Sequence, residues 1–254
     1  MKSNIIIVGL PRVGKSTLLK EIVIGKQLYG DKLTTGLITT EILENKQRVG
    51  FKMGWVGYED DKNVTRVIAH KKLHSNKFPT VSNYGVDVNA IKQAVEDEID
   101  STFDSPAVYY LDEIGEMQLH CREFKNLATS FLEKKEPTLM TMTSVFENPF
   151  IKFIKRHKNV IFVNLTADNR EKMKFFISKM ISKIEKAEEY AQQKKRWKEE
   201  EKALLFVSDS KKLRMVDLKK NTCSCEFFRN HEICSHILAA EELFPERIKV
   251  RNVF

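Results

Sequence analysis

The sequence of 254 residues contains no run of apolar residues that approaches the ~20 needed to span a lipid bilayer. This absence argues against a membrane-spanning helix and against a membrane partner. Charged residues make up 31% of the chain, which is typical of proteins that fold in water. The first residues enter an apolar strand within five positions, which argues against a signal peptide. We therefore expect a cytoplasmic protein.

The sequence also lacks a concentrated patch of one charge, although its formal net charge is +8. Basic residues outnumber acidic ones by 3 in residues 1–170, by 3 in residues 171–202 and by 2 in residues 203–254. Because this excess is spread along the chain, composition alone does not establish nucleic-acid binding.

Cysteine is scarce, with four residues, yet three of them lie within twelve positions. In a cytoplasmic protein such clustering indicates a metal site before a disulfide. Cys223-x-Cys225, then eight residues, then Cys234-x-His236 supplies three thiolates and one imidazole, the ligand set of a closed tetrahedral zinc site. His231 is the competing fourth ligand. We prefer His236 because its Cys-x-His spacing mirrors the Cys-x-Cys arm.

The most informative stretch is residues 5–20, which read IIIVGLPRVGKSTLLK. Four apolar residues predict a buried strand, and a glycine-bounded loop then leads into a helix, which is the P-loop pattern. Backbone N–H groups and the helix dipole attract phosphates there, Lys15 reaches the β- and γ-phosphates, and the Ser16 hydroxyl ligates Mg²⁺. The residues expected to bind nucleotide in this stretch are Gly9, Leu10, Pro11, Arg12, Val13, Gly14, Lys15, Ser16 and Thr17.

A second strand, residues 107–113, reads AVYYLDE and ends in two carboxylates. Ligands of open α/β sheets bind at the carboxyl edge of the strands, so these acids belong beside the P-loop. We expect Asp112 to hold Mg²⁺ and Glu113 to orient and deprotonate the attacking water.

The remaining pattern alternates strands and helices, which predicts an α/β fold with a largely parallel sheet. Strands are expected at residues 35–43, 47–56, 64–69, 138–143 and 160–165, and helices at residues 89–103, 116–134 and 149–157. Residues 35–56 should form a hairpin, with residues 64–69 as an antiparallel partner.

The last part of the chain suggests a separate small module. Residues 190–202 are polar on all sides, which predicts a charged, solvated helix. Strands at residues 204–207 and 213–218, a turn at Asp209-Ser210 and a helix at residues 237–243 predict a zinc-binding ββα module. We therefore divide the chain into a nucleotide-binding domain (1–178), a charged helical linker (179–202) and a zinc module (203–254), and expect the two modules to fold independently.

Residues 5–170 resemble the P-loop nucleoside-triphosphatase family first described from thermophiles, which has a cancer-related human member. The motifs that carry the resemblance are GLPRVGKSTLL, TGLITTEI followed by RVGF, NYGV at 83–86, YLDEIGEM at 110–117, NPFI at 148–151 and LTADNR at 165–170. The resemblance implies a RecA-like sheet with helices on both faces and slow, broadly specific hydrolysis of ATP, GTP and other triphosphates. It also implies that Asn169 and Arg170 lie near the base.

The chain departs from the family at several positions. The family usually has glycine at Arg12, whose side chain must lean out of the loop or approach the phosphates; we favour leaning out, because a cation in that crowded loop needs a partner. The family often has glutamate at Gln118, and an arginine-bearing stretch at residues 144–146. An arginine near the γ-phosphate stabilises transition-state charge. The candidates to replace it are Arg48, Arg156 and Arg170.

Residues 203–243 resemble the SWIM zinc finger, whose signature is Cys-x-Cys, a short spacer and Cys-x-His. SWIM fingers are associated with DNA or protein binding, so the resemblance implies a DNA, RNA or protein partner. The first hypothesis is an Mg²⁺-dependent nucleoside-triphosphatase with a zinc-binding adaptor. The alternatives are a nucleotide or small-molecule kinase and a nucleotide-gated regulatory or DNA-processing switch.

Overall fold

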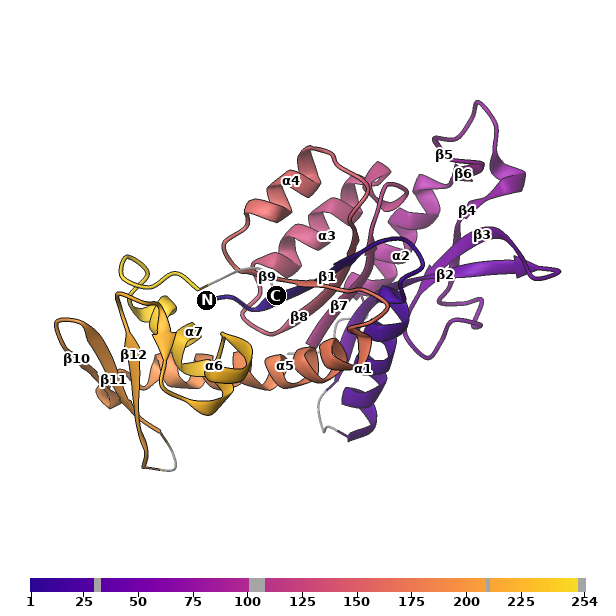
Figure 1. The fold of residues 1–254 in the computed structure, drawn as a ribbon. Helices are drawn as coiled ribbons and strands as arrows, with labels where there is room; N and C mark the ends of the chain where they lie inside the picture. The colour runs from indigo at the N-terminus through magenta and orange to yellow at the C-terminus, as the bar shows by residue number, and fades with distance from the viewer. Residues whose placement is uncertain (30–32, 101–107, 209–210, 251–254) are drawn as a thin grey trace.

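The structure, a computed structural model, describes residues 1–29, 33–100, 108–208 and 211–250. A large sheet with helices on both faces occupies most of the chain, and a small sheet with two short helices lies at one side (Figure 1). No helix among the described residues is both long enough and apolar enough to cross a membrane.

The large sheet has nine strands in the order β5-β6-β4-β3-β2-β7-β8-β1-β9. Its strands are β1 (Asn4–Gly9), β2 (Thr34–Glu44), β3 (Gln47–Gly54), β4 (Arg66–His70), β5 (Thr80–Val81), β6 (Tyr84–Val86), β7 (Val108–Ile114), β8 (Thr138–Thr143) and β9 (Val160–Asn164). The five strands from β2 to β9 in this order pair in parallel, and β3, β4, β6 and β5 extend the sheet by antiparallel pairing. The predicted α/β fold and its hairpin are therefore confirmed.

Parallel pairing brings the carboxyl ends of the central strands together. β1 pairs with β8 so that Gly9 faces Thr143, and β7 pairs with β8 so that Leu111 faces Met140. The loop after β1 and the acids at the end of β7 consequently lie at one edge of the sheet. The strands of this core are buried on both sides, as their continuous apolar runs predict.

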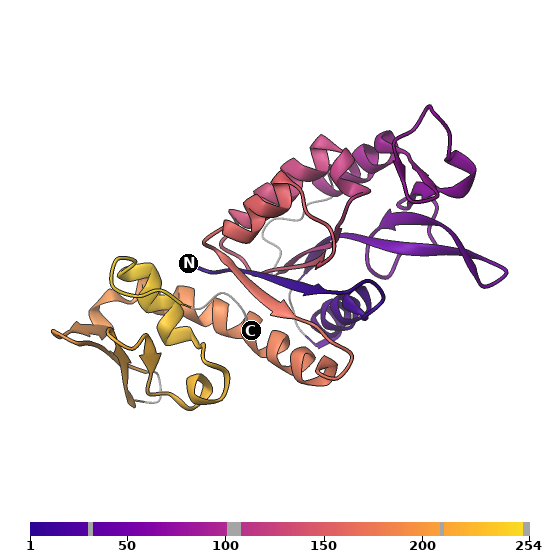
Figure 2. The same cartoon turned by 45° about the horizontal axis from the view of Figure 1, so that its top comes forward.

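Five helices cover the sheet: α1 (Lys15–Tyr29), α2 (Val88–Asp100), α3 (Arg122–Leu132), α4 (Pro149–Arg156) and α5 (Arg170–Gln192). Helices α2, α3 and α4 lie on one face, and α1 and α5 lie on the other (Figure 2). The helix expected at 116–134 is divided, because Cys121 adopts an extended conformation between a 3₁₀ turn, η2 (Gln118–His120), and α3. Residues 101–103 and Ala107, at the ends of two predicted elements, lie outside the described residues.

The C-terminal part contains more elements than the predicted ββα module. Its strands form a sheet in the order β10-β11-β12-β13, and its two helices flank the metal-binding residues. The elements are η3 (Lys194–Arg196), β10 (Trp197–Glu199), β11 (Ala203–Val207), β12 (Leu213–Asp217), β13 (Thr222–Cys223), α6 (Glu226–His231) and α7 (Ser235–Leu243). The turn predicted at Asp209-Ser210 falls outside the described residues.

The prediction of a solvated helix over residues 190–202 is wrong beyond Gln192, where α5 ends. Trp197 begins strand β10 and packs on Phe206, with 4.7 Å between the ring centroids, and its indole N–H donates to the Tyr190 carbonyl at 3.0 Å. The polar pattern of residues 190–202 does not reveal the contact with Phe206, because Phe206 belongs to β11, outside this segment. The segment therefore begins the small sheet.

Helix α5 packs against both parts of the chain. Its buried residues run from Met173 to Tyr190, and they share one continuous apolar core with α1 and with the zinc module. A second contact joins the parts where Lys2 Nζ lies 3.6 Å from Glu241 Oε1 of α7. The division at residues 178 and 202 stays a prediction, and any fragment that tests it should keep α5 with the zinc module.

Candidate functional site

The P-loop follows β1 and ends where α1 begins, at Lys15. Gly14 has a φ of +94°, a backbone conformation in which a residue with a Cβ is strained, and an added Cβ would also displace the end of the Arg170 side chain, 2.6 Å away at Nη1. Arg12 has a φ of +65°, is exposed and borders the pocket described below, so the expectation that its side chain leans out of the loop stays a prediction. Val13 closes the turn by donating its N–H to the Leu10 carbonyl at 3.4 Å.

Lys15 is buried, and its ammonium group contacts three oxygen atoms. Nζ donates to the carbonyls of Gly9 at 3.3 Å and Leu10 at 3.1 Å, and lies 3.6 Å from Glu113 Oε1. A phosphate group carries more negative charge than the Glu113 carboxylate, so it can replace Glu113 as the partner of the Lys15 ammonium group. Glu113 is partly exposed, so it can also reach water.

Asp112 is fully buried beside the start of α1. Its Oδ1 accepts from the Ser16 hydroxyl at 2.9 Å and from the Thr141 hydroxyl, whereas its Oδ2 is buried without a hydrogen-bond partner among the described residues. Burial raises the pKa of Asp112 to about 6. An unpaired buried carboxylate oxygen beside a serine hydroxyl is the donor set that Mg²⁺ prefers, so these residues fit a divalent cation.

These groups line one pocket of about 730 Å³ at the carboxyl edge of the sheet. The P-loop residues on its wall are Pro11, Arg12, Gly14, Lys15, Ser16 and Thr17. Asp112 and Glu113 lie opposite them, and the pocket continues to Arg48, Phe51 and Val81 of the antiparallel extension. Because it extends past the lysine, the pocket has space for more than a phosphate chain.

The three candidate arginines lie in different places. Arg48 lines the pocket, is paired with Glu41 at 2.7 Å and lies over the Phe51 ring. Arg170 contacts the Gly14 carbonyl at 3.5 Å and Glu21 at 2.7 Å, so it supports the loop from behind. Arg156 lines a separate hollow on α4.

Asn169 precedes Arg170 and turns its amide toward its own loop. Its Oδ1 accepts from Thr166 N at 2.9 Å, and its Nδ2 donates to the Asn164 carbonyl at 2.8 Å. Neither Asn169 nor Arg170 is among the described residues that line the pocket. Their role near a base stays a prediction.

Sequence reasoning missed the threonines that hold the acidic strand. Thr141 of β8 donates to the Asp112 carboxylate, and Thr39 of β2 donates to the Asp112 carbonyl at 2.9 Å. Gln118, noted only as a departure from the family, is buried and donates to the Thr39 hydroxyl at 3.0 Å. The available signal was a set of threonines inside otherwise apolar strands, since a buried hydroxyl needs a partner.

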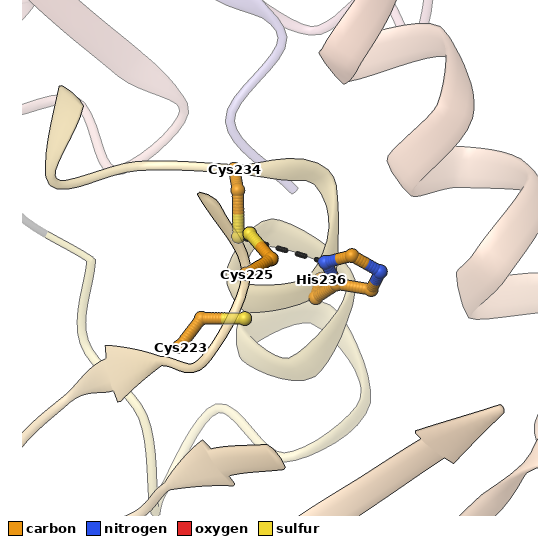
Figure 3. A group of neighbouring side chains, drawn as sticks. All are labelled: Cys223, Cys225, Cys234 and His236. Carbon is orange, nitrogen blue, oxygen red and sulfur yellow. Dashed lines mark hydrogen bonds between the residues drawn. The ribbon is translucent and has the colours of Figure 1, made fainter. Parts of the chain in front are cut away.

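The four predicted zinc ligands lie together in the small module (Figure 3). The sulfur atoms of Cys223, Cys225 and Cys234 and a ring nitrogen of His236 all lie within 4.8 Å of one another, and all four residues are buried. Cys234 Sγ is 3.8 Å from His236 Nδ1. A tetrahedral zinc ion with bonds of about 2.3 Å separates its ligand atoms by about 3.8 Å, so the cluster fits zinc.

His231, the competing ligand, lies in α6 among aromatic rings and is not part of this cluster. Neighbouring residues hold the cluster in place. The Cys225 sulfur accepts from Phe228 N at 3.4 Å and caps α6, and the His236 ring stacks on Tyr190 of α5 with 5.3 Å between centroids. Hydrogen bonds from Cys223 and Cys234 lower the pKa of Cys225, which favours the thiolate that binds metal.

Comparison with known proteins finds relatives that cover about two thirds of the chain. The curated relatives include Nucleoside-triphosphatase THEP1 of Aquifex aeolicus (strain VF5), 29% identical over 182 residues that cover 66% of this chain and 93% of the relative. They also include the Methanocaldococcus jannaschii protein of the same name, 29% identical over 172 residues that cover 67% of this chain and 92% of the relative.

Two solved structures resemble the large domain. The crystal structure of THEP1 from Aquifex aeolicus aligns with a TM-score of 0.55 and 25% identity, and covers 70% of this chain and 98% of that chain. The solution structure of a human cancer-related nucleoside triphosphatase shares the fold, with a TM-score of 0.57 and 21% identity, and covers 70% of this chain and 96% of that chain.

Family profiles match the same two regions. Residues 207–243 match the SWIM zinc finger. Residues 4–178, more than half of the chain, match the NTPase family, and the protein therefore belongs to that family.

Proposed function

We propose that this protein is an Mg²⁺-dependent hydrolase of ATP, GTP and other nucleoside triphosphates, with a zinc-bound SWIM module that binds nucleic acid or another protein. The observation that carries the hydrolase is the convergence of Lys15, Ser16, Asp112 and Glu113 on one pocket. The curated relatives are named nucleoside-triphosphatases, which supports the reaction. The cytoplasm stays the predicted compartment.

The P-loop would bind the phosphates. The first N–H groups of α1 have no partner within the helix, so they and the helix dipole attract the anion. A triphosphate in the pocket competes with Glu113 for Lys15, because its γ-phosphate carries more charge than a carboxylate. Binding therefore releases the Glu113 carboxylate next to the γ-phosphate.

Ser16 and Asp112 would hold Mg²⁺, which neutralises charge on the β- and γ-phosphates when it is bound. Glu113 would take a proton from a water molecule, whose oxygen bonds to the γ-phosphorus. The bond between that phosphorus and the bridging oxygen then breaks, and the products are a nucleoside diphosphate and inorganic phosphate. Of the three candidates Arg48, Arg156 and Arg170, Arg48 is the one that lines this pocket, which supports it as the side chain that would add positive charge there.

Glu113→Gln tests this mechanism. It keeps the shape of the side chain and leaves Lys15 and Asp112 intact, so triphosphate binding should remain while turnover falls about 10²-fold or more. Lys15→Ala should weaken binding and abolish phosphate release. Glu133→Gln, at an exposed position that does not line the pocket, is the matched control. Equal loss of binding and turnover in Glu113→Gln would contradict its role as the base.

The kinase alternative is supported by the extension of the pocket to Arg48, Phe51 and Val81, which leaves room for a phosphate acceptor. Phosphate release measured without any acceptor separates the two functions. Free phosphate at the same rate as nucleotide consumption supports hydrolysis, whereas consumption that requires an added acceptor supports a kinase.

The nucleotide-gated switch is supported by α5, whose first residue contacts the P-loop and whose last turn packs on the zinc ligands. A pull-down from lysate with the zinc-loaded protein tests it, with and without triphosphate. A partner retained in only one nucleotide state supports the switch, and equal retention in both states contradicts it.

A further inference from the structure

Helix α5 carries a row of lysines and one aromatic residue along its outer side. Lys172, Phe175, Lys179 and Lys183 follow one another at intervals of three, four and four residues, which places them on one face of the helix. We call these four residues the α5 stripe. The stripe is about 16 Å long at the rise of an α-helix. Helix α6 of the zinc module packs beside it.

The aromatic part of the stripe is open to solvent. Phe175 is 56% exposed, although it lies among apolar neighbours that are buried. Lys179 Nζ lies 5.5 Å from the centre of its ring, and His231 of α6 lies 6.5 Å away on a tilted plane. Phe227 of α6 lies beside it and is half-buried, with the His231 ring 4.4 Å and Lys183 Nζ 4.8 Å from its ring centre. Aromatic rings and ammonium groups therefore alternate along α5 and α6.

The lysines of the stripe are not paired with carboxylates of the described residues. Residues 172–184 contain four lysines and no carboxylate. Lys174, outside the stripe, pairs with Glu21 at 2.7 Å, whereas the lysines at positions 172, 179 and 183 form no ion pair with any described carboxylate. Burial and the charge of Lys172 lower the pKa of His231, which agrees with a cationic surrounding.

The two features together select the partner. An apolar protein surface would leave three lysines unpaired, and a purely acidic surface would leave the exposed ring without a contact. A duplex covers the faces of its bases, so it offers the ring nothing to stack on. Single-stranded nucleic acid offers phosphates for the lysines and base faces for the rings, which is how proteins bind such strands without sequence preference.

We propose that the α5 stripe and Phe227 bind single-stranded nucleic acid, with bases stacked on the phenyl rings and phosphates on the lysines. The proposal rests on the binding role proposed for the zinc module, because Cys225 caps α6 and thereby fixes Phe227 in place. It extends the binding surface from α6 of the zinc finger onto α5, which lies outside the residues that match the finger, and the nucleotide site plays no part in it.

Fluorescence anisotropy with the zinc-loaded full chain tests the proposal. The probes are labelled oligo-dT and oligo-U of about 12 nucleotides and a duplex of the same length. Phe175→Ala should weaken binding of the single strands about tenfold without changing the salt dependence. Lys179→Ala combined with Lys183→Ala should lower the slope of log affinity against log salt by about 1.4, since each phosphate contact in a single strand contributes about 0.7.

Matched controls lie outside the stripe. Phe153→Ala removes an exposed phenylalanine from α4, and Lys194→Ala combined with Lys195→Ala removes two exposed lysines from η3. Both should bind like the unaltered chain. Zinc content and circular dichroism confirm that each variant is folded.

Three results would overturn the proposal. The first is that the stripe variants bind the single strands as well as the control variants do. If Cys223→Ser lost binding in the same experiment, the binding role of the zinc module would stand and the role of the stripe would not. A preference for the duplex would exclude the single-stranded partner. Absence of binding to every probe would remove nucleic acid as the partner, while phosphate release by the same preparation would show the hydrolase to be unaffected.

Discussion

Replacement of Tyr190 by alanine should destabilise the zinc module more than the rest of the protein. Tyr190 is 3% exposed and lies in the last turn of α5. Its ring packs on Phe206 with 4.4 Å between centroids and stacks on the zinc ligand His236. A buried aromatic residue truncated to alanine costs about 3–5 kcal/mol in free energy of unfolding.

We expect this cost to fall on the zinc module, where the contacts are. A loss of about 3 kcal/mol raises the population of the opened module about a hundredfold, because each 1.4 kcal/mol changes an equilibrium constant tenfold. If zinc leaves from the opened form, its transfer to a coloured chelator should accelerate by a similar factor. Phosphate release should persist, since Tyr190 is about 30 Å along α5 from Arg170.

The assay follows zinc transfer and phosphate release on the same preparation. Tyr58→Ala, which removes a tyrosine that is 58% exposed, is the matched control and should leave the rate of zinc transfer unchanged. Equal rates of zinc transfer in Tyr190→Ala and the unaltered chain would refute the conclusion that α5 completes the core of the zinc module. Loss of phosphate release with the fold intact would instead show that the two sites depend on each other.

Three further predictions concern the sheet and the metal. Burial raises the pKa of Glu98 to about 7, so the native state binds this proton more tightly than the unfolded state, and the stability it contributes is lost as pH rises from about 4.5 through 7. Urea unfolding should show Glu98→Gln gaining about 3 kcal/mol relative to the unaltered chain between pH 4.5 and pH 8, and a difference independent of pH would contradict this. Gly36→Ala should lower the melting temperature strongly, because a Cβ there stands 1.8 Å from the Tyr110 carbonyl, whereas Gly25→Ala meets nothing within 4 Å and should not. Cys223→Ser should reduce the zinc content measured by mass spectrometry while basal phosphate release continues, and full zinc content would remove Cys223 from the ligand set.

The nucleotide site was predictable because its signals are local. A strand, a glycine-bounded loop and Gly-Lys-Ser lie next to one another in the sequence, and Asp112 and Glu113 end a strand of unmistakable apolar character. The zinc ligands were predictable for the same reason, since their spacing is short. A threonine inside an apolar strand signals that Thr141 needs a partner, but the pairing of β7 with β8, which neither strand specifies alone, makes that partner Asp112.

The solvated helix was wrongly predicted beyond Gln192 for a related reason. Residues 190–202 carry only a few apolar side chains, so their pattern by itself indicates solvent on all sides. Tyr190 and Trp197 are nevertheless enough to attach the segment to the small sheet, because each packs on Phe206 of β11, later in the chain. Burial by a partner distant in sequence overrides a weak local pattern.

The continuity of α5 also sets what the zinc module can do in space. A flexible linker would let the module sample a volume and would bring its partner to the nucleotide site as a local concentration that depends on linker length. Helix α5 has 23 residues, about 34 Å, and it is packed at both ends. A molecule bound to the module would consequently be held at one distance and in one orientation from the P-loop.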